Sequence, residues 1–302
     1  MSSIGSAVVV GSLAGGLHAL SLRLSWGWAL AWVALVPLLR VAAAGERTRT
    51  VAATIAYALT LGQADVTPWL APAIGRYFAF AAAPATVVGV VIMTLLSTAY
   101  GAVLAALLVA RRAARDDLGI VWCAAAWSVW EALRWVVPPY LASCALALSQ
   151  LDVLPVLQLA SIAGIASVSA LVVAGNAALA GLADAHRSWR RRLGAVAAIA
   201  AVASGVIAWG TRRLAIVPAG PPASVVLVDG AARTGAESTL ARYVAATPRG
   251  LEPPPSVVVW PESALEVDFE QDRAAWRRLA AFVDALGAVS YTHLTLPTKR
   301  IV

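Results

Sequence analysis

The sequence predicts a multi-span α-helical membrane bundle followed by the N-terminal part of an α/β domain. The chain of 302 residues is 60% hydrophobic and only 13% charged, whereas soluble domains are about 45–50% apolar and about 25% charged. Long apolar runs separated by short arginine-rich loops fill residues 1–215, and they predict the membrane bundle. Two valine-rich segments and an amphipathic helical pattern within residues 216–288 predict the α/β part.

Seven apolar runs are candidates for membrane spans. A span needs about 20 apolar residues, because the hydrocarbon core is about 30 Å thick and a helix rises about 1.5 Å per residue. The runs cover residues 5–22, 26–44, 51–70, 80–110, 119–137, 154–183 and 192–211. The short connection between the first two predicts a hairpin, and the lack of a basic leader predicts that the first run is retained. The fourth and sixth exceed a single span, so we expect tilt or a lateral or re-entrant piece.

Arginine placement predicts the orientation. Ten arginines follow the second, fourth and sixth runs, against four in the alternate loops and beside the last run. The ten are Arg40, Arg47, Arg49, Arg111, Arg112, Arg115, Arg187, Arg190, Arg191 and Arg192, and the four are Arg23, Arg76, Arg212 and Arg213. The richer side should be cytoplasmic. Seven spans then put the α/β part on the periplasmic face of a bacterial inner membrane, and the loop bias explains the net charge of +7 without nucleic-acid binding.

The segment after the membrane region alternates strand and helix patterns. "ASVVLVDG" and "SVVVWPES" are typical of buried strands, and "GAESTLARYVAAT" and "DRAAWRRLAAFVDALG" of helices. The last helix places Trp276, Leu279, Phe282, Val283 and Leu286 on one face. We expect adjacent parallel strands at 225–228 and 257–260, in a sheet covered on both faces. The segment is shorter than the usual domain of about 100–150 residues.

Several motifs in both parts resemble one enzyme family. A valine-rich strand ending in W-P-E at 260–262 resembles the nitrilase superfamily of carbon–nitrogen hydrolases. "WGWALAWVALVPLLR" (26–40), "WSVWEALRW" (127–135) and the S-Q…P-x-x-Q-x-A…G run within 147–179 resemble the apolipoprotein N-acyltransferase family. The chain departs from that family at "VDGAARTGA" (228–236), where Q-G-N is usual after the first strand.

Glu262 is the candidate catalytic residue. The resemblance implies that it is the general base of a Glu-Lys-Cys triad, accepting first the thiol proton and then a proton from the incoming amine. A strand end holds such a carboxylate with little positional freedom. The alternative is that Glu262 caps the following helix or is solvated. The Lys and Cys partners are absent from the α/β segment, since the only lysine is Lys299 and the cysteines are Cys123 and Cys144. We therefore expect the chain as it stands to be inactive.

We expect residues 289–302 to be a non-native tail. Up to Ala288 every basic residue is Arg or His, and the following "VSYTHLTLPTKRIV" brings three threonines and the only lysine. Its back-translation resembles a transposon adapter used in sequencing libraries. We expect the native α/β domain to continue differently from this point.

The remaining polar residues of the membrane region have mainly structural interpretations. Glu131 and Arg134, at i and i+3, should satisfy each other, with a lipid headgroup contact as the alternative. His18 should be a packing residue, and the two cysteines should pack without a disulfide. Asp65, Gln150 and Asp152 fall on the expected outer side, where a phospholipid headgroup could approach. Trp26, Trp28, Trp69 and Trp135 suit aromatic belts at the interfaces.

The resemblance implies a reaction between two lipid substrates. The full-length parent would transfer an acyl chain from a phospholipid, through a cysteine thioester, to the N-terminal amine of a diacylglyceryl-cysteine lipoprotein. We expect a monomer in the lipid bilayer, without a cofactor or a metal ion. Two other functions remain open, namely a membrane-anchored amidase of the nitrilase superfamily and a non-enzymatic lipid-binding or transport protein.

Overall fold

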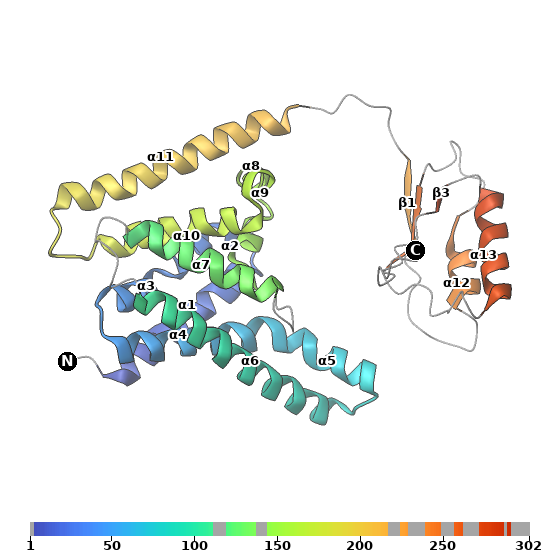
Figure 1. Ribbon diagram of the computed structural model, residues 1–302, viewed down its shortest axis with the longest axis horizontal. Coiled ribbons are helices and arrows are strands. Elements are labelled where there is room, and N and C mark those ends of the chain that lie inside the picture. Colours follow the sequence, from blue (N-terminus) through green and yellow to red (C-terminus); the bar gives the residue numbers. More distant parts are fainter. Residues whose placement is uncertain are drawn as a thin grey trace, which may run out of the picture. The chain divides into compact units, whose positions relative to one another are not determined.

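The computed structural model describes most of the chain and divides it into two compact units. The described residues are 3–110, 119–136, 144–216, 224–228, 239–248, 257–261, 272–286 and 289–290. The units are Met1–Val217 and Pro218–Val302 (Figure 1).

The first unit is a helical bundle. Its helices are α1 (Ile4–Ser21), α2 (Gly27–Ala34), α3 (Val36–Ala43), α4 (Arg47–Leu61), α5 (Thr67–Phe78), α6 (Ala82–Ala110), α7 (Gly119–Val136), α8 (Leu154–Leu157), α9 (Ala160–Ala163), α10 (Ile165–Gly181) and α11 (Trp189–Leu214). A π-helical turn η1 (Gly62–Val66) joins α4 to α5, and a 3₁₀ helix η4 (Leu146–Gln150) precedes α8. Helix α4 lies between α1 and α6, and α10 packs on α7.

Two glycines let α1 and α4 approach closely. Gly11 and Gly15 are four residues apart and therefore lie on one face of α1. A Cβ atom at Gly11 would lie 2.0 Å from the carbonyl oxygen of Ala53, and one at Gly15 would lie 2.5 Å from that of Tyr57. The backbones are thus in contact, as in the small-xxx-small packing of membrane helices.

Every predicted apolar run is helical over most of its described length, but fewer helices than seven pass as single spans. Three of the described helices, α1, α6 and α11, are long and apolar enough to cross a membrane, or up to four if the bent α8–α10 segment is one span. The second run is broken at Leu35 into α2 and α3, which together cover 27–43. Helix α7 is less apolar than α1 and α6, because it carries the charged residues Glu131 and Arg134. The third run continues beyond residue 70, through η1 and α5 to Phe78.

The sixth run, for which we expected tilt or a lateral or re-entrant piece, is sharply bent, as in a broken span or a re-entrant loop. Residues 154–163 and 165–181 meet at an angle of 120°. Gly164 makes this bend with a φ of 73°, in the left-handed region where only glycine is unstrained. The start of this segment touches α11, where a Cβ at Gly210 would lie 2.0 Å from the carbonyl oxygen of Pro155.

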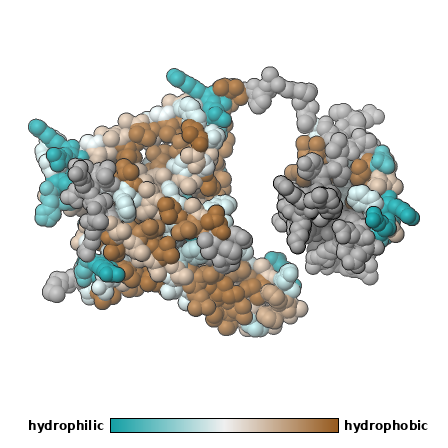
Figure 2. Space-filling model, viewed as in Figure 1, coloured by the Kyte–Doolittle hydropathy of each residue, from teal (hydrophilic) through white to brown (hydrophobic). Residues whose placement is uncertain are grey.

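The surface of the bundle is largely hydrophobic. Figure 2 shows apolar residues covering most of the visible face of this unit, with hydrophilic residues gathered near its ends. Helix α11 buries only Gly210 and exposes large apolar side chains such as Leu193 and Val202. A surface of this kind is typical of helices that face lipid.

The second unit contains a parallel sheet. Strands β1 (Val225–Leu227), β2 (Val257–Val259) and β3 (Val289–Ser290) are in the order β1-β2-β3. β1 and β2 are parallel, with Val226 opposite Val258, so the predicted pairing of these two segments is confirmed. Helices α12 (Thr239–Ala246) and α13 (Arg273–Leu286) connect the strands.

The two helices cover the same face of the sheet, which differs from the expected cover on both faces. Right-handed crossovers that advance in one direction put successive helices on one side, and Figure 1 shows α12 and α13 together on one side of the strands. Val258 and Val228 are buried, whereas Val225 and Leu227 are 51% and 77% exposed. The described part of the sheet therefore has one open apolar face.

Candidate functional site

The predicted base follows the carboxyl end of β2. The strand ends at Val259, and the structure describes the chain through Trp260 and Pro261. Glu262 itself lies outside the described residues. What the structure describes is the packing that supports this strand end, through Pro261.

Trp260 anchors the strand end against both helices. Its ring centroid lies 5.3 Å from that of Tyr243 on α12 and 5.9 Å from that of Phe282 on α13. Its indole Nε1 donates to Thr247 Oγ1 at 3.1 Å. An aromatic side chain that is packed between two helices and has its N–H hydrogen-bonded has little freedom, so the end of β2 is held in place.

A second group of polar residues lies inside the helical bundle. His18 is fully buried, and its Nδ1 is 2.6 Å from the hydroxyl oxygen of Tyr57. The His18 and Tyr57 rings are stacked, and Trp127 meets the Tyr57 ring edge-on at 5.7 Å between centroids. The environment agrees with the packing role expected for His18, except that its Nε2 is buried without a hydrogen-bond partner among the described residues.

Glu131 is a buried acceptor that holds a distant segment. Its Oε1 accepts hydrogen bonds from the Leu146 amide at 2.8 Å and from Trp127 Nε1 at 3.0 Å. The next amide, that of Ala147, donates to Ser169 Oγ on α10 at 3.0 Å. The first amides of η4, which have no partner within a helix, are therefore satisfied from α7 and α10.

Arg134 lies beside Glu131, but the expected mutual pair is not formed. No ion pair joins the two residues in the part of the chain that the structure describes. The guanidinium carbon of Arg134 lies 4.6 Å from the centroid of the Trp130 ring, in a cation–π arrangement. Each charge thus has partners of its own, because the helix places Glu131 toward η4 and Arg134 over an aromatic ring.

Asn176 is an organising residue that the sequence analysis did not single out. Its Oδ1 accepts from the Leu35 amide at 2.8 Å, and its Nδ2 donates to the Ala31 carbonyl at 2.9 Å. These are the two groups that an unbroken helix would join to each other. The side-chain amide of α10 thus closes the gap between α2 and α3. A lone asparagine inside an apolar run was the available signal.

The three candidates for headgroup contact have different surroundings. Gln150 is fully buried and donates to the Trp28 carbonyl at 3.0 Å, so it is structural. Asp65 is paired with Arg23, with 3.6 Å between Oδ1 and Nε, and its Oδ2 is 3.4 Å from Cys144 Sγ. Asp152 is exposed.

The cysteines and tryptophans agree with their expected structural roles. Cys123 and Cys144 are buried, and no disulfide joins them. Trp26, Trp28 and Trp69 are about half exposed, as is Trp135. Among the described residues, no group of three or more His, Cys, Asp or Glu could hold a metal ion.

The apolar bundle defines the class of the protein, which is a helical membrane protein. Comparison with protein families then identifies its relatives. The apolipoprotein N-acyltransferase N-terminal domain matches residues 14–178, which is more than half of the chain, and the protein belongs to this family. A search of curated proteins gives no match.

Proposed function

We propose that the full-length protein transfers an acyl chain from a phospholipid to the N-terminal amine of a diacylglyceryl-cysteine lipoprotein. The observation that carries the proposal is the match of the family's N-terminal domain to residues 14–178. The parallel strands β1 and β2, with Glu262 next after the described end of the second, support a nitrilase-like catalytic domain. The open apolar face of the sheet suits the second sheet of an α-β-β-α sandwich.

The proposed reaction has two steps. Glu262 takes the proton of the catalytic thiol, and the thiolate attacks the acyl ester carbonyl of the phospholipid. The ester C–O bond breaks, the lysophospholipid oxygen takes the proton, and the acyl chain remains as a thioester. The lipoprotein amine then attacks the thioester carbonyl, loses a proton to Glu262 and leaves as an amide, while the thiol is restored. A lysine stabilises the oxyanion in both steps.

The proposed orientation places the arginine-rich loops in the cytoplasm and the α/β unit in the periplasm. Residues from the end of α3, the start of α7 and the α10–α11 loop line one cavity, so these ends lie together. Arg23 and Asp65, which were both expected on the other side, are also paired with each other. These groupings support an alternating path of the chain through an inner membrane.

The 302-residue chain should not catalyse acyl transfer. Its cysteines are both buried in the helical bundle, and its only lysine is Lys299. Without a thiol at the site, Glu262 has no nucleophile to deprotonate, and covalent catalysis is lost.

A chimera tests both the reaction and the role of Glu262. The C-terminal half of a homologous acyltransferase is fused after Ala288, and the purified protein is assayed for acylation of a diacylglyceryl peptide by phospholipid. We expect turnover by the chimera, and none by the 302-residue chain or by the chimera with Glu262→Gln. Turnover by the 302-residue chain, or an active Glu262→Gln chimera, would refute the assignment. Release of free fatty acid without peptide acylation would instead favour an amidase-like hydrolase.

A further inference from the structure

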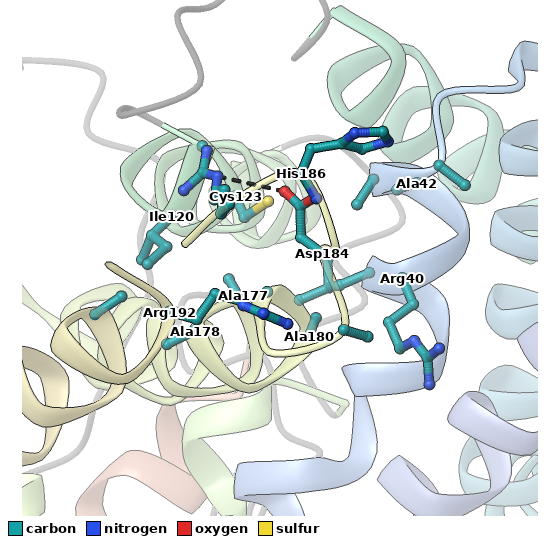
Figure 3. Close-up of a pocket in the computed structure, with 18 of the residues that line it drawn as sticks. Arg40, Ala42, Ile120, Cys123, Ala177, Ala178, Ala180, Asp184, His186 and Arg192 are labelled. Atoms are coloured by element: carbon teal, nitrogen blue, oxygen red, sulfur yellow. Dashed lines mark hydrogen bonds and ion pairs between the residues drawn. The ribbon is translucent and has the colours of Figure 1, made fainter. Parts of the chain in front are cut away.

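A cavity of about 750 Å³ lies at one end of the helical bundle. It is formed by the end of α3, the start of α7, the end of α10 and the loop into α11 (Figure 3). This volume is within the range of about 300–1,000 Å³ typical of small-molecule sites. The short side chains of Ala177, Ala178 and Ala180 on α10 leave this space open.

The lining of the cavity has an excess of positive charge. Four arginines line it, Arg40, Arg187, Arg191 and Arg192, against one carboxylate, Asp184. That carboxylate is already used, because its Oδ2 is 3.3 Å from Arg187 Nε and its Oδ1 accepts the His186 amide at 3.0 Å. The dashed line in Figure 3 marks the pair of Asp184 with Arg187. The remaining charge favours an anion.

Arg192 has hydrogen-bonding capacity that the described residues do not use. Its Nη1 donates to the Leu182 carbonyl at 2.8 Å, which fixes the side chain between α10 and α11. Its Nε is buried and has no hydrogen-bond partner among the described residues. A buried guanidinium N–H without an acceptor is uncommon in folded proteins. The start of α11, capped by Ser188 at the Arg191 amide, adds the positive end of a helix of 26 residues.

We propose that this cavity binds the phosphodiester headgroup of an anionic glycerophospholipid, with Arg191 and Arg192 as its main ligands. Basic pockets between membrane helices suit such headgroups. A lipid is favoured over a soluble phosphate because α11 rises from the cavity with an almost wholly unpacked apolar surface, including Leu193 and Val202. Acyl chains can lie along that surface while the headgroup contacts the arginines. The proposal does not depend on the acyl-transfer chemistry.

Charge alone could attract anionic lipids to any arginine-rich loop, and the neighbouring Arg190 provides a control for this effect. Its guanidinium carbon lies 5.6 Å from the centroid of the Trp189 ring, and it does not line the cavity. Arg190→Gln therefore makes the same change of charge in the same turn without touching the site. Arg192→Lys keeps the charge and tests the need for the guanidinium.

Native mass spectrometry of the purified 302-residue chain in detergent can measure the affinity for one bound lipid. The probes are phosphatidylglycerol, phosphatidylcholine and soluble glycerol phosphate. We expect phosphatidylglycerol to bind at least about ten-fold more tightly than phosphatidylcholine. Arg191→Gln and Arg192→Gln should each weaken it about five-fold, which corresponds to about 1 kcal/mol per arginine near a headgroup. Arg190→Gln should change the affinity for phosphatidylglycerol less than two-fold, because a residue outside the site is not coupled to the bound lipid.

Three results would overturn the proposal. The first is an equal loss in Arg190→Gln, which would indicate diffuse surface charge. The second is equal affinity for phosphatidylcholine. The third is glycerol phosphate that binds as tightly as the lipid, which would indicate a soluble anion. If Arg192→Gln disturbs folding, as judged by circular dichroism and gel filtration, the exposed Arg191 still decides the outcome against Arg190.

Discussion

At the scale of single residues, buried side chains complete backbone hydrogen bonds that the helices leave open. Asn176 bridges the Ala31 carbonyl and the Leu35 amide, and Glu131 accepts the Leu146 amide. Inside a membrane such backbone groups cannot form hydrogen bonds with water, so each side chain that satisfies them contributes more to stability than it would in a soluble protein. Neither partner could be identified from the sequence alone, because Leu35 and Asn176 are 141 positions apart.

Replacing Asn176 with Ala should destabilise the bundle. The change leaves the Ala31 carbonyl and the Leu35 amide unsatisfied, and each such group costs about 1–3 kcal/mol. The total should therefore exceed the ~0.6 kcal/mol of an average hydrogen bond between membrane helices. Unfolding in mixed dodecylmaltoside and SDS micelles, followed by circular dichroism, measures the difference. Gln158→Ala is the control, since Gln158 is only partly buried and, among the described residues, its side chain donates only to the nearby Leu154 carbonyl. Equal stability of the two variants would contradict this role of Asn176.

Two substitutions of Glu131 separate its hydrogen bonds from its charge. Gln retains an oxygen that can accept from Leu146 and Trp127, so Glu131→Gln should cost less than about 1 kcal/mol. Glu131→Ala leaves both donors unsatisfied and should cost about 1–3 kcal/mol for each. If a charge pair with Arg134 were the main interaction, Gln would be about as harmful as Ala, because a broken buried pair costs about 3–5 kcal/mol. The same micellar unfolding assay distinguishes these outcomes.

At the scale of elements, long uninterrupted runs were predictable and their interruptions were not. α6 and α11 agree closely with the apolar runs at 80–110 and 192–211. The continuation of α4 into α5 depends on the π-helical turn η1, where a Cβ on Gly62 would lie 2.2 Å from Ser97 Oγ of α6. That close approach is a tertiary contact, and the composition of the run does not indicate it. The bend at Gly164 was predictable only as excess length in the sixth run.

The contact between α1 and α4 can be tested with two glycines of one helix. Gly11→Ala would place a methyl group 2.0 Å from the Ala53 carbonyl oxygen, so the helices must separate. Overpacking of this kind typically costs about 1–3 kcal/mol. Gly16→Ala meets no atom within 4 Å and should be neutral or slightly stabilising. Thermal unfolding of both variants in detergent checks the difference, and a loss of stability in Gly16→Ala alone would contradict the described packing.

At the scale of the whole molecule, composition was enough to predict a membrane bundle and an α/β part, but less informative about the site. The parallel pairing of β1 and β2 followed from a strand–helix–strand order that admits few other arrangements. The prediction for Glu262 rests on family resemblance, since the described chain stops at Pro261 on this side. The arrangement of both helices on one face could not be predicted, because the order of strands in a sheet depends on contacts between distant segments.

The orientation in the membrane remains a prediction with a direct test. Loops rich in arginine are retained in the cytoplasm, and ten such residues follow the second, fourth and sixth runs. Reporter fusions after Arg49, Arg115 and Arg192 should therefore all indicate the cytoplasm. At each position we expect a fused alkaline phosphatase to be inactive and a fused green fluorescent protein to fluoresce. A fusion after Ile216 should show the opposite pattern, because it follows α11. Periplasmic signals at two of the three arginine positions would overturn the orientation, and with it the periplasmic placement of the α/β unit.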